Sequence, residues 1–144
     1  MYQTILLCYD GTREGRQALR EGADMAVRCR AQKTHLLAVM RLLPAVAVVD
    51  GVIPQEIFTH EQELAQEILD EGVAKLRERG LEAEGHLAFG EPVEQIAATA
   101  RHLRADLIVL GHRNRSRLSM WWRSSVSASL VEQAPCSILV AVTD

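Results

Sequence analysis

The sequence predicts an α/β fold with a single open five-stranded parallel sheet, helices on both faces and doubly wound connections. Three observations lead to this prediction. Short apolar runs rich in Ile, Leu and Val recur along the chain, and segments with helical periodicity separate them. The length of 144 residues suits one domain. Strands that alternate with helices in this way are expected to lie parallel and to be joined by crossovers.

Five apolar runs are the candidate strands. Residues 5–9, 107–110 and 138–142 are nearly all apolar, as expected of strands that are buried on both faces. Residues 35–40 are similar. In residues 81–89 the apolar side chains alternate with polar or small ones, which is typical of a half-exposed edge strand.

The segments between the runs carry apolar residues three, four or seven positions apart, as amphipathic helices do. In residues 13–30 the apolar stripe is made of small residues, which permit close packing on the sheet: Leu19, Gly22, Ala23 and Ala26. A long second helix is expected to end at Gly80. The third begins at Glu91 and Pro92, which suit a first helical turn, and Pro135 stops the last.

Composition points to a cytoplasmic protein without a membrane span or a nucleic-acid partner. The longest apolar stretch, residues 42–54, is broken by proline and aspartate, whereas a spanning helix needs roughly 20 apolar residues. The N-terminus lacks the pattern of a secretory signal. A net charge of -3 argues against a nucleic-acid surface. Cys8, Cys29 and Cys136 are expected to be reduced, mostly buried thiols.

The histidines show no metal-ligand spacing along the chain. They are His35, His60, His86, His102 and His112. We expect them to be scattered over the surface, and no metal site is predicted.

Ligand chemistry is expected at the carboxyl edge of the sheet, because open α/β sheets bind ligands beyond the ends of their strands. The first strand ends in Tyr9 and is followed by Asp10 and Thr12. Thr12 is placed to cap the next helix, and Asp10 to accept hydrogen bonds from a ligand. A capped turn with an exposed aspartate is the alternative interpretation.

The fourth strand is expected to end at Gly111 and to lead into an arginine-bearing loop that returns to a serine-lined helix start. Free N–H groups and the helix dipole favour an anion there. Arg113, Ser124, Ser125 and Ser127 are therefore candidate phosphate contacts. The alternatives are a solvated arginine loop and serines that only cap the helix.

The C-terminal third carries a distinctive pattern. It reads ADLIVLGHRN, then the loop, then SSVSASLVEQAPCSILVAV, and it follows Asp10 and the Gly90-Glu91-Pro92 start of the third helix. Together these motifs resemble the universal stress protein family from residue 5 to residue 142. The resemblance implies one universal stress protein domain over residues 1–144, with an adenine-nucleotide-binding-like fold.

ATP-binding members of this family carry glycine, two residues, glycine, nine residues, then glycine followed by Ser or Thr. Here the pattern falls on Gly111, Asn114, Ser124 and Ser125, so the spacing is kept while two of the three glycines are replaced. Asn114 is the milder replacement, because Asn tolerates positive φ. Ser124 adds a Cβ and a hydroxyl, which either crowd a phosphate or donate a hydrogen bond to it.

The resemblance also implies where the ligand lies. The adenine is placed near Tyr9, Asp10 and Val39. The phosphates lie over residues 111–114 and 124–127, which include Val126. The implied cofactor is ATP or a related adenine nucleotide, with Mg²⁺ if it is a triphosphate.

Two functional hypotheses follow. In the first, the nucleotide orders the loop after Gly111 and switches a partner surface. In the second, the pocket is vestigial and the protein is a ligand-independent homodimer in stress signalling. The resemblance implies a homodimer through the apolar C-terminal edge strand, which pairing would cover. No nucleophile stands beside a base and no phosphate-loop lysine is present, so no enzyme is predicted, although slow ATP hydrolysis stays open.

Overall fold

The computed structural model describes residues 1–9, 13–40, 55–113 and 126–143. In this part of the chain, strands and helices alternate from beginning to end. The elements are β1 (Thr4–Cys8), α1 (Arg13–Cys29), β2 (Lys33–Met40), α2 (Gln55–Glu78), β3 (Ala83–Phe89), α3 (Pro92–Leu103), β4 (Leu107–Arg113), α4 (Val126–Gln133) and β5 (Ser137–Thr143). The predicted order of elements is confirmed.

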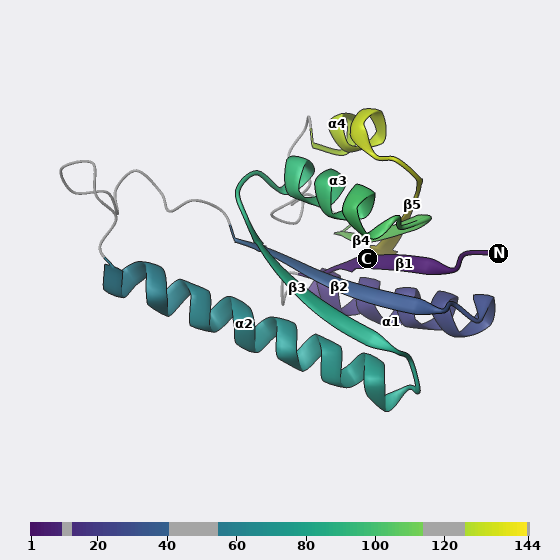
Figure 1. The fold of residues 1–144 in the computed structure, drawn as a ribbon, viewed down its shortest axis with the longest axis horizontal. Helices are drawn as coiled ribbons and strands as arrows, with labels where there is room; N and C mark the ends of the chain where they lie inside the picture. Colours follow the sequence, from purple (N-terminus) through teal and green to yellow (C-terminus); the bar gives the residue numbers. More distant parts are fainter. Residues whose placement is uncertain (10–12, 41–54, 114–125, 144) are drawn as a thin grey trace.

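The five strands form one parallel sheet in the order β3-β2-β1-β4-β5. β1 lies at the centre and pairs with both β2 and β4, so Leu7 is flanked by Leu36 and Val109. Helices α1 and α2 cover one face of the sheet, and α3 and α4 cover the other (Figure 1). This is the predicted doubly wound α/β fold, and β3 and β5 are its edge strands.

The sheet separates two hydrophobic cores. Alternate residues of β1 and its extension point to opposite faces: Ile5, Leu7 and Tyr9 join the α1 and α2 core, whereas Leu6 and Cys8 join the α3 and α4 core. All five are at most 4% exposed. A strand buried on both faces has no polar position to offer, which explains why this run is apolar without alternation.

Small residues let α1 and α2 lie close to the sheet. A Cβ added at Gly22 would stand 2.2 Å from Leu7 Cδ2, and one added at Gly72 would stand 2.4 Å from Leu36 Cδ2 and 3.0 Å from Tyr9 Cδ1. The predicted small-residue stripe of the first helix is therefore confirmed, and α2 uses the same device. At Gly22 and Gly72, the contacts of α1 and α2 with the sheet leave no space for an additional side-chain atom.

The predicted helix boundaries at glycine and proline are also confirmed. Gly80 has φ +81° and follows the end of α2. Gly90 has φ +134°, and its N–H donates to the Met40 carbonyl (2.9 Å), which ties the end of β3 to the end of β2. Glu91 occupies the N-cap position of α3 without a side-chain capping hydrogen bond, and Pro92 is the first residue of the helix.

Three features differ from the prediction or add to it. β4 does not end at Gly111 but continues to Arg113, because residues 111–113 pair with residues 141–143 of β5.

Among the cysteines, only Cys8 is buried, while Cys29 and Cys136 are half-buried. Burial, and then the nearby charge of Asp106, raise the pKa of the Cys136 thiol. In the part of the chain that the structure describes, no helix is long and apolar enough to span a bilayer.

The close approach of α2 to the sheet predicts that Gly72→Val lowers the free energy of unfolding by about 1–3 kcal/mol, the usual cost of overpacking. Urea denaturation followed by circular dichroism measures this loss. The matched control is Ala74→Val, on the exposed side of the same turn, which should cost only a few tenths of a kcal/mol in helix propensity. Equal stabilities of the two variants would contradict the packing described.

Candidate functional site

The carboxyl edge of the sheet is where the two central strands part. The ladder between β1 and β4 extends to Leu7 and Val109, whereas β4 continues along β5 as far as Arg113. Within the sheet, β2 is the neighbour of β1 on one side and β4 is its neighbour on the other. The chain passes from β1 through α1 to β2 and reaches β4 only later. The strand order therefore reverses between β1 and β4, and open α/β sheets bind ligands at this switch point.

Tyr9 lies at this edge but is directed into the core. Its N–H donates to the Leu37 carbonyl (3.0 Å), and its side chain is 1% exposed beside Gly72. The buried Tyr9 hydroxyl has no hydrogen bond of normal geometry within the described residues. The Arg16 guanidinium nevertheless lies near it, and interaction with the Tyr9 hydroxyl is the main cause that raises the pKa of Arg16. The Tyr9 side chain therefore packs in the core beneath the carboxyl edge of the sheet. Its contact with a nucleotide stays a prediction.

Val39 and Gly111 flank the end of β1. Val39 is half-buried near the end of β2, pairs with Ala88 and packs on the α3 and α4 core. Gly111 is half-buried in β4 and pairs with Ala141. When the β1–β4 register is extended by two residues, Gly111 comes level with Tyr9. The structure therefore brings three of the predicted site residues to one edge.

The remaining predicted residues are placed only in part. Arg113 is the last residue of β4, and Val126 and Ser127 are the first two residues of α4, which lies against α3. The others, Asp10, Thr12, Asn114, Ser124 and Ser125, lie outside the described residues.

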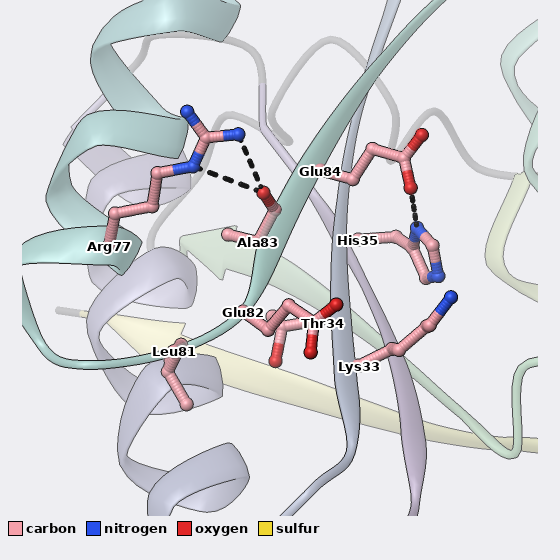
Figure 2. Close-up of a pocket in the computed structure, with 8 residues that line it drawn as sticks. All are labelled: Lys33, Thr34, His35, Arg77, Leu81, Glu82, Ala83 and Glu84. Carbon is pink, nitrogen blue, oxygen red and sulfur yellow. Dashed lines mark hydrogen bonds and ion pairs between the residues drawn. The ribbon is translucent and has the colours of Figure 1, made fainter.

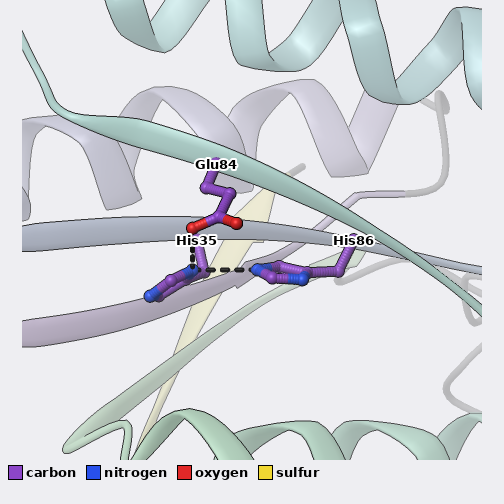
Figure 3. A group of neighbouring side chains, drawn as sticks. All are labelled: His35, Glu84 and His86. Carbon is purple, nitrogen blue, oxygen red and sulfur yellow. Dashed lines mark hydrogen bonds and ion pairs between the residues drawn. The ribbon is translucent and has the colours of Figure 1, made fainter.

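Two histidines meet on the face of the sheet that α3 covers. His35 Nδ1 stands 2.9 Å from His86 Nε2, and the ring centroids are 5.0 Å apart (Figure 3). His35 is only 4% exposed, so the expectation that the histidines are scattered over the surface is wrong for this residue. Burial, and then the proximity of His86, lower the pKa of His35.

Sequence reasoning missed this pair because the two histidines are 51 positions apart. Only the pairing register of β2 with β3 brings them together, since Leu37 is the partner of His86 and His35 the partner of Glu84. The one available signal was a histidine within each of two predicted strands, residues 35–40 and 81–89, and that signal fixes neither the adjacency of the strands nor their register.

Two of the cavities lined by described residues lie near these histidines. One, of about 470 Å³, opens at the amino ends of β2 and β3 (Figure 2). In it Arg77 donates two hydrogen bonds to the Ala83 carbonyl (3.2 and 3.0 Å), and the buried Thr34 hydroxyl has no partner within the described residues. The other, of about 310 Å³, lies between the sheet and α3, with His86 and His102 in its lining.

A five-stranded parallel sheet of this order, with helices on both faces, is a doubly wound α/β fold whose switch point lies beside Gly111. The sequence model of the universal stress protein family matches residues 1–141. A universal stress protein of Thermus aquaticus is 30% identical over 141 residues, which cover 97% of this chain and 98% of that protein. The chain belongs to the universal stress protein family.

Solved structures agree on the fold. A universal stress protein family member from Burkholderia pseudomallei has a TM-score of 0.76 at 24% identity and covers 96% of this chain, with 95% of its own length matched. An Arabidopsis thaliana family protein with AMP bound has a TM-score of 0.68 at 20% identity, over 99% of this chain and 92% of its own. The Archaeoglobus fulgidus protein in complex with dAMP has a TM-score of 0.65 at 21% identity, over 96% and 97%.

Proposed function

We propose that this protein is a cytoplasmic regulatory module that binds ATP or a related adenine nucleotide at the carboxyl edge of its sheet and acts as a homodimeric switch. The observation that carries the proposal is the parting of β1 and β4 beside Gly111. Family structures that hold AMP and dAMP support the ligand class. The proposal assigns no catalytic residue.

The residues of this edge suit the two ends of an adenine nucleotide. The half-buried Val39 offers an apolar surface for the base, and Asp10 follows the buried Tyr9 with a carboxylate that can accept hydrogen bonds. Gly111 lets the backbone approach a phosphate without a Cβ. The N-terminus of α4, with Ser124 and Ser125 before it, adds free N–H groups, and Mg²⁺ would accompany a triphosphate.

A second candidate function rests on the two replaced glycines. Asn114 and Ser124 stand where ATP-binding relatives carry glycine. If Ser124 blocks the phosphates, the protein is a ligand-independent homodimer in stress signalling. The edge strand β5, which pairs on one side with β4, is common to both proposals.

The nucleotide proposal predicts that freshly purified protein releases an adenine nucleotide on denaturation, and that the stripped protein binds ATP, ADP or AMP in calorimetric titration. Asp10→Ala should weaken this binding about 10- to 100-fold, since a hydrogen bond to a charged group contributes about 1.5–3 kcal/mol. Asp70→Ala, on an exposed turn of α2, is the control and should bind normally. No released nucleotide together with no heat of binding would refute the proposal.

The hypothesis that Ser124 crowds a phosphate gives a second prediction. Ser124→Gly should strengthen ATP binding about tenfold, equivalent to about 1.4 kcal/mol, and AMP binding less, because AMP carries fewer phosphates than ATP does. Ser137→Gly, at the exposed start of β5, should change neither affinity. Weaker ATP binding by Ser124→Gly would show instead that the hydroxyl is a ligand contact. Calorimetry with both nucleotides separates these outcomes.

The dimer proposal predicts a dimer at micromolar concentration in sedimentation velocity. Val142 of β5 is 51% exposed, and Val142→Lys should shift the protein to monomer, because a charge cannot be buried in an apolar edge contact without a partner. Leu64→Lys is the matched control, because Leu64 is 41% exposed on α2 and α2 packs on β2 and β3, at the edge of the sheet opposite to β5. A wild-type monomer, or dissociation by both variants, would count against the β5 interface.

A further inference from the structure

We propose that His35, Glu84 and His86 form a binding site for a divalent transition-metal ion of the zinc class. The three side chains come from the two neighbouring strands β2 and β3 and converge on one face of the sheet (Figure 3). One ligand atom from each lies within 4.8 Å of the other two. Two imidazoles with one carboxylate are a ligand set that zinc uses, with water in the fourth position.

The strand register explains why the three groups meet. His35 pairs with Glu84 in the parallel ladder, and Leu37 pairs with His86. Side chains two residues apart on a strand point to the same face, and Leu37 belongs to the core under α3 and α4. His35, Glu84 and His86 therefore share that face, on rigid strands rather than on loops.

The distances fit a metal after small movements. His35 Nδ1 and His86 Nε2 are 2.9 Å apart, and Nδ1 is 4.0 Å from Glu84 Oε2. Two nitrogens at about 2.0–2.1 Å from a tetrahedral zinc ion stand about 3.3 Å apart, so the rings need to separate by only a few tenths of an ångström. Glu84, with a side chain 67% exposed, is free to swing inward.

The protonation of the pair also suits a metal. Two nitrogens at 2.9 Å share one hydrogen, so one ring donates and the other accepts. On binding, the shared proton moves to the other nitrogen of its ring, so both facing nitrogens present lone pairs to the ion.

The surroundings leave access for the ion and its water. His86 lines the cavity of about 310 Å³ beneath α3, and Glu84 lines the cavity at the amino ends of β2 and β3 (Figure 2). Lys33, two residues before His35, carries a nearby charge that opposes a cation. The carboxylate of Glu84 offsets that charge at the ion itself.

The proposed metal site is separate from the nucleotide edge. Val39 lies four residues beyond His35 on the same strand, a distance of about 13 Å at the usual rise of a parallel strand. Metal binding to His35, Glu84 and His86 therefore does not depend on a nucleotide. The two proposals can fail independently.

The test uses nucleotide-free, tag-free full-length protein that has been treated with a chelator. Calorimetric titration with Zn²⁺ should give one ion per chain, and Co²⁺ should give visible absorption bands of a tetrahedral site with nitrogen and oxygen ligands. Mg²⁺ should not compete, because it prefers octahedral oxygen ligands. The absence of zinc binding, or a Co²⁺ spectrum with intense thiolate bands from the cysteines, would overturn the proposal.

Variants identify the ligands. His86→Gln and Glu84→Gln alter half-buried and exposed positions that should fold normally, and His86→Gln should weaken zinc binding roughly 100-fold or more, since even outer-shell changes cost about 10- to 100-fold. His60→Gln, on an exposed turn of α2 over the other face, is the matched control and should bind as the wild type does. Unchanged affinity in His86→Gln, or lost affinity in His60→Gln, would refute the site.

Discussion

The burial of β1 on both faces is the constraint on which the rest of the structure depends. This strand has to satisfy its hydrogen bonds through β2 and β4 and its apolar side chains through helices on both sides. Two helix layers are therefore required. Because the chain departs from β1 toward β2 and returns later to β4, the reversal of strand order at the centre follows from the same arrangement.

That reversal determines where ligand chemistry is available. At the carboxyl edge the described ladder between the central strands ends at Leu7 and Val109, while β4 makes four further pairs with β5. The backbone at Gly111 is thus held by its pairing with Ala141 of β5, at the edge where the strand order reverses. The proposed nucleotide site uses an edge created by topology, and the proposed metal site uses a register within one strand pair. The two sites have different structural origins.

The sequence was sufficient for the element order and the parallel sheet, because full burial removes alternation from strands such as residues 5–9 and small residues mark the contact stripe of α1. It placed the end of β4 too early, since Gly111 is read locally as a terminator while pairing with Ala141 extends the strand. The candidate nucleotide residues came from spacing along the chain. His35 and His86 could not be found in that way, because their contact depends on the register of β2 against β3, which no local pattern specifies.

The two faces of the sheet also differ in how much sequence change they can absorb. Under α1 and α2, Gly22 and Gly72 lie within contact distance of Leu7 and Leu36, so a side chain added at either glycine would displace a core residue. Under α3, a cavity beside Leu37 and Ala98 leaves room for larger side chains. Substitutions by larger side chains should therefore be tolerated better on the α3 face of the sheet than on the α1 and α2 face. New binding properties can arise on the α3 face without disturbing the packing around β1.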